Sequence, residues 1–181
     1  WFRDSMHKLP YLVMALVLTY RLTDTIWGSF ASPFYLDELG YTKSEMAVAS
    51  KFFGVGALML GVTLGGVCMA WLGRMATMTL GALTAALTNL LYADLSTGGH
   101  VMAASARLTG FTWIVEHLGG DERMAKLMLA IGGENIAGGL AGTALVAYLS
   151  SITSKGYSAV QYALLSSLTF LVGTLGRGAL G

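Results

Sequence analysis

Two groups of polar side chains lie inside long apolar stretches of this sequence, where a charge is costly. Arg21 and Asp24 are three residues apart, which places them on one face of a helix. Glu134 and Asn135 follow each other within a run of glycines. Because ionisable residues at membrane depth usually serve a function, we interpret these four residues as candidates for binding a substrate or carrying a proton.

Each group also has a structural interpretation. Arg21 and Asp24 can neutralise each other and lock two helices together without contacting a substrate. A carboxyl group as deep as that of Glu134 should favour its neutral form, because desolvation penalises the charge. Glu134 is therefore either a proton carrier or a carboxyl group held by a hydrogen bond to a neighbouring helix, and the sequence leaves both interpretations open.

Gln161 and Tyr162 are further candidates for substrate binding, near the start of the last apolar stretch. Ser158 precedes Gln161 by three residues, which is the spacing of a helix capping box. A tyrosine at a membrane boundary is a common anchor. Both candidates thus have structural alternatives. The capping-box spacing of Thr42 and Glu45 predicts a second helix start.

Signals for catalysis and metal binding are weak. His100, Glu116 and His117 lack the i, i+4 spacing of metal ligands on a helix. The sequence contains no phosphate-binding loop, nucleophile elbow or H-E-x-x-H motif. Cys68 is the only cysteine, so no disulfide forms within the chain. We predict that the chain is not an enzyme and holds neither a metal nor a cofactor.

The composition indicates what surrounds these residues. Of 181 residues, 55% are hydrophobic and 12% are charged, whereas about 25% of a soluble domain is charged. The 24 glycines are about twice the average usage. Small residues let membrane helices approach closely, as the G-x-x-x-G pairs Gly61/Gly65 and Gly138/Gly142 would allow. Membrane lipids are the expected partner; the net charge of +1 and the lack of a basic cluster argue against nucleic acid.

Five stretches are long and apolar enough to cross a membrane as helices, which requires about 20 residues. They lie near residues 9–31, 45–72, 76–95, 125–152 and 158–176. Between the third and fourth stretches, apolar residues recur every three or four positions from 100 to 123, which indicates one amphipathic helix at the membrane surface. A sixth span is the alternative. The predicted fold class is an all-α, polytopic transmembrane helical bundle, and the positive charges divide too evenly to orient it.

Several motifs resemble those of a transporter family. Gly66, Gly73 and Arg74 match the G-x-x-x-D-x-x-G-R loop motif of the major facilitator superfamily, although Ala70 occupies the acidic position. Longer stretches resemble the AmpG muropeptide permeases, a branch of this superfamily, over most of the chain except residues 100–123. They are YRLTDT at 20–25, SPFYLD at 32–37, GYTKSE at 40–45, ENIAGG at 134–139, AYLSS at 147–151 and YSAVQYALLSS at 157–167.

This resemblance implies a function and a place in a larger fold. The chain would form the seventh to eleventh spans of the transporter, within its C-terminal half, and its partner would be the missing N-terminal half. The family imports anhydro-muropeptides across the Gram-negative inner membrane with the proton gradient, for cell-wall recycling and β-lactamase induction. The substrate is N-acetylglucosaminyl-anhydro-N-acetylmuramic acid, with or without peptide. The family orientation implies that Gly73, Arg74 and Lys155 face the cytoplasm.

Within such a transporter the candidate residues have expected roles. Arg21 would hold a substrate carboxylate, because a guanidinium group can bind both oxygens. Asp24 would orient Arg21 or exchange protons. Glu134 would couple protons or bind a sugar, and Asn135 would bond hydroxyl or acetamido groups. The alternatives are a transporter of the same superfamily for acyl-CoA, a sugar or a drug, a structural membrane subunit, and a membrane-embedded enzyme.

Overall fold

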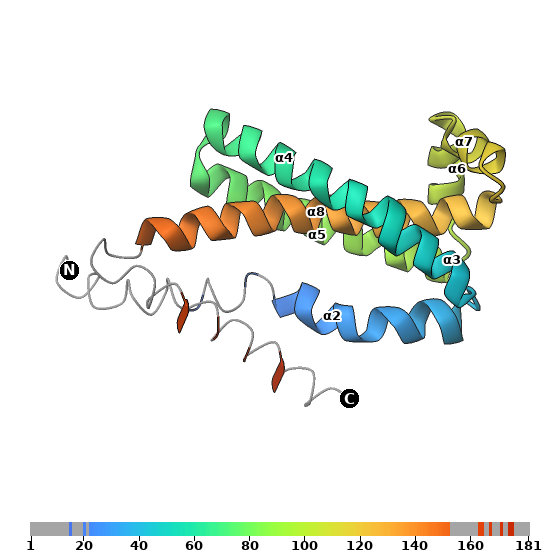
Figure 1. The fold of residues 1–181 in the computed structure, drawn as a ribbon, viewed down its shortest axis with the longest axis horizontal. Helices are drawn as coiled ribbons and strands as arrows, with labels where there is room; N and C mark the ends of the chain where they lie inside the picture. Colours follow the sequence, from blue (N-terminus) through green and yellow to red (C-terminus); the bar gives the residue numbers. More distant parts are fainter. Residues whose placement is uncertain are drawn as a thin grey trace. The chain divides into compact units, whose positions relative to one another are not determined.

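The computed structural model describes residues 15, 20 and 22–152, and single residues at 163, 164, 167, 171, 174 and 175. All regular elements among these residues are helical (Figure 1), which confirms the predicted all-α fold class. In chain order they are α2 (Leu22–Pro33), the π-helical turn η1 (Phe34–Glu38), α3 (Lys43–Ala47), the π-helical turn η2 (Val48–Gly54), α4 (Val55–Leu72), α5 (Arg74–Ser96), α6 (His100–Leu108), α7 (Phe111–His117) and α8 (Glu122–Ile152).

The chain divides into two compact units. Residues 35–144, here called the central unit, contain the elements from η1 to most of α8. The other unit contains α2 and the last turns of α8. Glu134 and Asn135 both belong to the central unit, so the contacts of these two candidates can be described within it.

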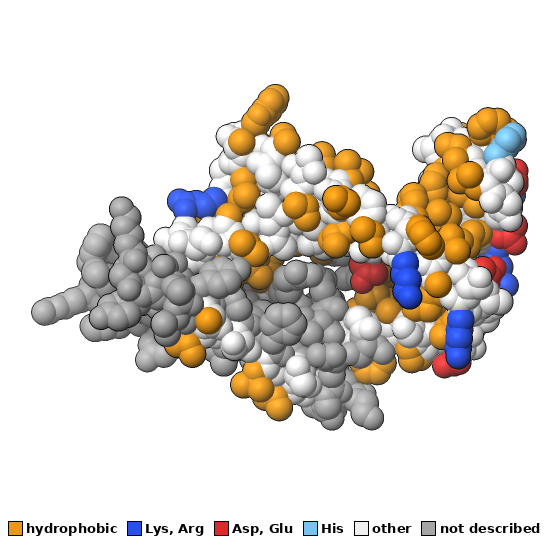
Figure 2. All heavy atoms as spheres, viewed as in Figure 1, with side chains coloured by type: hydrophobic (Ala, Val, Ile, Leu, Met, Phe, Trp, Pro, Cys, Tyr) orange, Lys and Arg blue, Asp and Glu red, His pale blue; other side chains and the backbone are white. Residues whose placement is uncertain are grey.

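Three helices are long and apolar enough to cross a membrane, namely Lys43–Leu72, Arg74–Ser96 and Glu122–Ser151. They overlap the second, third and fourth stretches predicted from the sequence. Helix α2 lies in the second half of the first stretch, whereas most of the rest of that stretch and of the fifth lies outside the described residues. Large apolar side chains such as Phe52 and Trp71 are exposed on these helices (Figure 2), as expected for surfaces that contact lipid.

The span Lys43–Leu72 is one continuous helix built from α3, η2 and α4. At its start the Thr42 hydroxyl accepts a hydrogen bond from the Glu45 backbone N–H at 3.2 Å, and the Glu45 carboxylate accepts one from the Thr42 backbone N–H at 2.7 Å. The predicted capping box is therefore confirmed. The helix ends at Gly73, whose φ of 81° suits glycine and turns the chain into α5.

Helices α4 and α8 cross at glycines. A Cβ atom at Gly61 would overlap the backbone of Ile136, and one at Gly65 would also press against α8. From the other side, a Cβ atom at Gly139 would lie 2.6 Å from the carbonyl oxygen of Leu58. The predicted close crossing at Gly61 and Gly65 is thus present, and it holds α4 firmly against the middle of α8.

The segment from 100 to 123, predicted as one amphipathic helix, instead forms α6 and α7 and the start of α8. Gly110 separates α6 from α7 because its φ of 73° lies in the left-handed region. The apolar periodicity continues across this glycine, so the pattern alone did not indicate the break. The two helices follow α5 and precede α8 along the chain, and they contact each other. We call them the α6–α7 hairpin.

Candidate functional site

The middle of α8 is packed between two neighbours because its side chains there are small. A Cβ atom at Gly132 would lie 2.5 Å from the ring of Phe53, which belongs to η2. A Cβ atom at Gly133 would lie 2.9 Å from Leu91 on α5. The two glycines thus let η2 and α5 approach α8 directly before its polar pair.

Glu134 is held by a hydroxyl group from α5. The Tyr92 hydroxyl donates a hydrogen bond to the Glu134 carboxylate. Tyr92 is only 6% exposed, and its ring packs against that of Tyr35, which is 2% exposed, with the ring centroids 6.2 Å apart. Glu134 is therefore part of a cluster with two buried phenols, contributed by η1 and α5.

Asn135 faces a different neighbour. Its side-chain nitrogen donates to the carbonyl oxygen of Ile131 at 2.7 Å, within α8. The same nitrogen lies beside Gly54, where a Cβ atom would be 3.3 Å away. Successive residues of a helix point about 100° apart, so Glu134 turns toward α5 and Asn135 toward η2. These two neighbours in sequence accordingly do not form one joint binding group.

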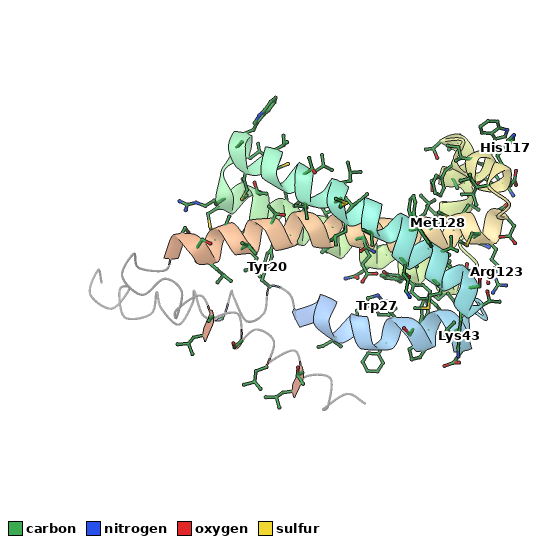
Figure 3. All side chains as sticks on the ribbon, in the orientation of Figure 1. Tyr20, Trp27, Lys43, His117, Arg123 and Met128 are labelled. Atoms are coloured by element: carbon green, nitrogen blue, oxygen red, sulfur yellow. The ribbon has the colours of Figure 1, made fainter. Side chains whose placement is uncertain are left out.

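The start of α8 is tied to the loop before α3. The Arg123 guanidinium donates to the carbonyl oxygen of Leu39 at 2.7 Å and stacks 4.3 Å above the ring of Tyr41. The Tyr41 hydroxyl donates to the Arg123 carbonyl oxygen at 3.1 Å. Figure 3 shows Arg123 near Lys43 at this end. Burial raises the pKa of the Tyr41 phenol, and the Arg123 guanidinium opposes part of that rise.

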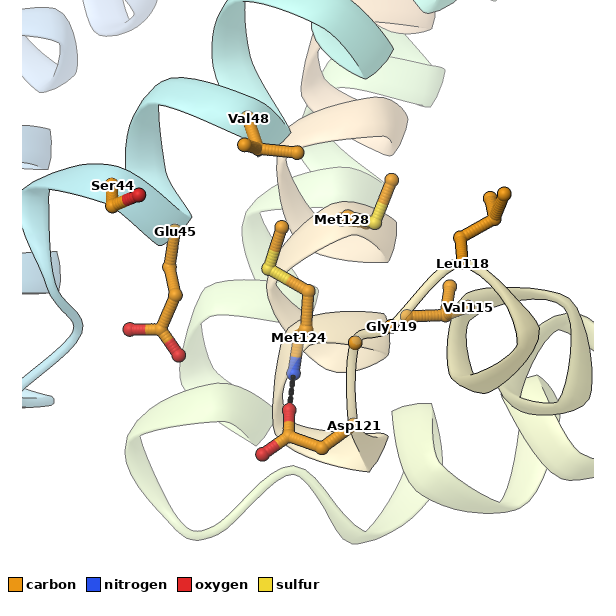
Figure 4. A pocket seen from close by; sticks show the side chains of 10 residues that line it. Ser44, Glu45, Val48, Val115, Leu118, Gly119, Asp121, Met124 and Met128 are labelled. Carbon is orange, nitrogen blue, oxygen red and sulfur yellow. Dashed lines mark hydrogen bonds between the residues drawn. The ribbon is translucent and has the colours of Figure 1, made fainter.

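A pocket of about 450 Å³ lies at the same end of the central unit (Figure 4). Its walls come from the start of the span Lys43–Leu72, from α7 and the loop after it, and from the start of α8. The lining residues are Ser44, Glu45, Val48, Val115, Leu118, Gly119, Gly120, Asp121, Met124 and Met128. Neither Glu134 nor Asn135 lines this pocket, so it is separate from the candidate site in the middle of α8.

Comparisons with known proteins reveal relatives along nearly the whole chain. It is 33% identical over 171 residues to a Rickettsia conorii protein named as transporter AmpG 4, covering 94% of this chain and 36% of that protein. It is 30% identical over 168 residues to an AmpG 1 transporter of Rickettsia prowazekii, covering 92% and 33%. It is 28% identical over 159 residues to the anhydromuropeptide permease of Escherichia coli K12, covering 88% and 28%.

The chain belongs to the AmpG family. The resemblance seen in the sequence motifs is thereby confirmed. The chain spans about a third of the length of the curated relatives it matches. No protein-family model and no solved structure matches it.

Four candidate residues of this AmpG relative have side chains outside the described part of the structure. Arg21, Gln161 and Tyr162 lie outside the described residues. Asp24 lies in α2, and its side chain is likewise outside the description. Their proposed contacts with a substrate remain predictions. Across the described part of the chain, no group of three His, Cys, Asp or Glu side chains has the arrangement of a metal site.

Tyr92 and Tyr35 were not among the residues predicted from the sequence. Tyr92 lies near the end of the third predicted stretch, where a tyrosine is easily interpreted as an interfacial anchor. Tyr35 lies in η1, just beyond the first predicted stretch. Only the packing of η1, α5 and α8 shows that these two phenols gather around Glu134, because the three residues are far apart in sequence.

Proposed function

We propose that this chain forms part of a secondary transporter that imports anhydro-muropeptides across the inner membrane of a Gram-negative bacterium, coupled to protons. Two observations support the proposal. The chain is related to the anhydromuropeptide permease of Escherichia coli over 88% of its length. Three of the described helices are long and apolar enough to cross a membrane, and one of them carries Glu134 in its middle.

The contact between Tyr92 and Glu134 carries the proton-coupling part of the proposal. A phenolic hydroxyl both donates and accepts hydrogen bonds. It donates to Glu134 while the carboxyl group is charged, and it can accept from the same group once that group is protonated. A partner of this kind serves both protonation states without carrying a charge itself, which suits a carboxyl group that gains and loses a proton in each cycle.

The remaining candidates supply the substrate contacts of the proposed transporter. In transporters of this type, two helical bundles move around a site near the middle of the membrane. Arg21 binds a carboxylate of the substrate, and Asp24 orients Arg21. Asn135, Gln161 and Tyr162 offer hydrogen bonds to the hydroxyl and acetamido groups of the sugars.

The experiment measures uptake of labelled anhydro-muropeptide into membrane vesicles that contain the protein. We expect unlabelled anhydro-sugars to compete for uptake, and acyl-CoA, other sugars and drugs not to compete. Arg21→Ala, Asp24→Asn and Glu134→Gln should each lower uptake at matched membrane levels. Glu116→Gln is the control, because Glu116 is exposed on α7, outside the middle of α8. Unchanged uptake in all three variants would remove these residues from the mechanism, and absence of competition would reject the substrate.

A further inference from the structure

The α6–α7 hairpin is fixed to the central unit. At the start of α6, the Asp94 carboxylate accepts hydrogen bonds from the backbone N–H groups of Val101 and Met102 at 3.1 and 2.9 Å. In α7 the ring of Phe111 packs against that of Phe53 on η2, with the centroids 5.5 Å apart. The hairpin therefore has a defined place beside the span Lys43–Leu72.

The attached hairpin nevertheless exposes large apolar side chains. Leu108 is 88% exposed, Leu118 79% and Trp113 61%. Val101 and Ile114 are also exposed. Figure 2 shows apolar side chains gathered on the side of the hairpin that faces back along α4. A soluble surface rarely leaves such a patch open, so this side indicates contact with an apolar partner.

The other side of the hairpin is polar. Arg107 forms an ion pair with Glu122, and Glu116 and His117 are exposed. Figure 2 shows charged side chains at the outer end of the hairpin. His117 also stacks with Trp113, with the ring centroids 4.0 Å apart. Trp113 shares the face of α7 that carries Glu116 and His117. An apolar side toward the spans and a charged side away from them are typical of helices that lie in a lipid–water boundary, where tryptophan is enriched.

The pocket beside the hairpin has the same apolar character. Five of its lining side chains are apolar: Val48, Val115, Leu118, Met124 and Met128. Val48 also begins a row of exposed apolar side chains that recur at helical spacing along the span Lys43–Leu72. This row consists of Val48, Phe52, Val55 and Met59. The pocket thus continues directly into a surface that faces hydrocarbon when the span crosses a membrane.

We propose that the α6–α7 hairpin lies in the lipid–water interface and that an acyl chain of a bilayer phospholipid fills the pocket beside it. Hydrocarbon is what the exposed row from Val48 onward meets once the span crosses a bilayer, so the same environment reaches the pocket without interruption. Glu45 and Asp121 lie at the polar end of the pocket, where their carboxylates remain hydrated near the headgroups. This inference concerns the lipid surface and holds for any substrate of the transporter.

The experiment places a nitroxide spin label at single cysteines in the protein reconstituted into phospholipid nanodiscs. Cys68, the only cysteine of the chain, is first replaced by serine. The labelled variants are Leu108→Cys, Ile114→Cys and Leu118→Cys on the hairpin and Val48→Cys on another wall of the pocket. Glu116→Cys is the matched control on the polar side of α7. The label's accessibility to oxygen, which concentrates in lipid, is compared with its accessibility to a water-soluble nickel complex.

We expect the four apolar positions to show an oxygen-to-nickel accessibility ratio several-fold above that of position 116. Equal ratios at positions 108, 118 and 116 would mean that the hairpin lies in water and would overturn the proposal. Labels at 48 and 118 that neither reagent reaches would mean that protein fills the pocket, which also overturns it. Because all four positions tested are exposed, their substitution should leave the fold intact, and a thermal unfolding measurement of each variant checks this.

Discussion

The two halves of α8 within the central unit hold their carboxylates in opposite ways. At the start of the helix, Asp121 accepts a hydrogen bond from the backbone N–H of Met124 at 2.7 Å, and Glu122 pairs with Arg107. In the middle, Glu134 lies between glycines and accepts a hydrogen bond from the hydroxyl of Tyr92, on another helix. Carboxylates at the start are served by the free N–H groups of a helix end and by water, whereas the middle one depends on packing.

This difference indicates where a functional carboxyl group is to be sought. Where a carboxylate caps a helix or pairs with an exposed cation, that structural role is enough to explain an acidic residue at the position. Glu134 does not cap the helix, because it lies about three turns inside it. Its neighbours are glycines that admit η2 and α5, and Tyr92, which donates to it, is a neutral partner. The following experiments test the contrast between these two regions.

The largest effect is expected where the middle of α8 is packed most closely. Gly61→Ala places a methyl group on the backbone of Ile136, and overpacking of this kind costs about 1–3 kcal/mol or more. Gly66→Ala is the matched control on the same helix, because a Cβ atom there meets nothing within 4 Å. Thermal unfolding in detergent should show a clearly lower Tm for Gly61→Ala only. Equal Tm values for the two variants would contradict the described crossing of α4 and α8.

A smaller effect is expected when the partner of Glu134 is removed. Tyr92→Phe leaves the carboxyl group without this donor, which costs about 1–3 kcal/mol. Tyr92→Phe combined with Glu134→Gln should lose less stability than the sum of the single variants, with a coupling of about 0.5–3 kcal/mol. Unfolding midpoints of the four proteins give this coupling. Strict additivity would show that the two side chains do not interact.

At the start of α8, an alkaline effect is expected from Tyr41. Burial raises the pKa of its phenol, opposed in part by Arg123, while an unfolded tyrosine titrates near pH 10. The stability contributed by the neutral phenol is therefore complete below about pH 10 and is lost as the pH rises above that value. Tyr41→Phe should make the decline in Tm between about pH 8 and pH 11 shallower than in the parent protein. Parallel declines would contradict the burial of Tyr41.

The smallest effect is expected from the ion pair of Arg107 and Glu122. Arg107 is exposed, and exposed ion pairs contribute little because water and salt screen them. Glu122→Gln should shift the Tm only slightly, and the shift should disappear at high salt. A large shift that persists at high salt would show that the start of α8 resembles the middle more closely than its contacts indicate.

The sequence predicts those parts of the fold that depend on local pattern. Long apolar runs indicated the helices, and the spacing of Thr42 and Glu45 indicated a helix start that the structure confirms. The break at Gly110 was missed because the apolar period continues through it. A glycine within a periodic pattern only sometimes interrupts a helix.

The candidate site was predicted only in part, for a similar reason. The depth of Glu134 and the glycines around it were visible in the sequence, and they directed attention to it. Its partner Tyr92 was not, because the contact joins two helices whose alignment depends on the crossing of α5 and α8. That Arg21 and Asp24 belong to the same site as Glu134 stays a prediction, because the side chains of Arg21 and Asp24 lie outside the described residues.

The most direct test of the proposed function separates exchange of substrate from its accumulation in Glu134→Gln. Vesicles preloaded with unlabelled anhydro-muropeptide report exchange, and vesicles with an imposed proton gradient report accumulation. If Glu134 couples protons, the neutral variant should still exchange substrate while it fails to accumulate it. Accumulation at the level of the parent protein would show that Glu134 serves only to join α5 and α8, and would contradict the proposed coupling.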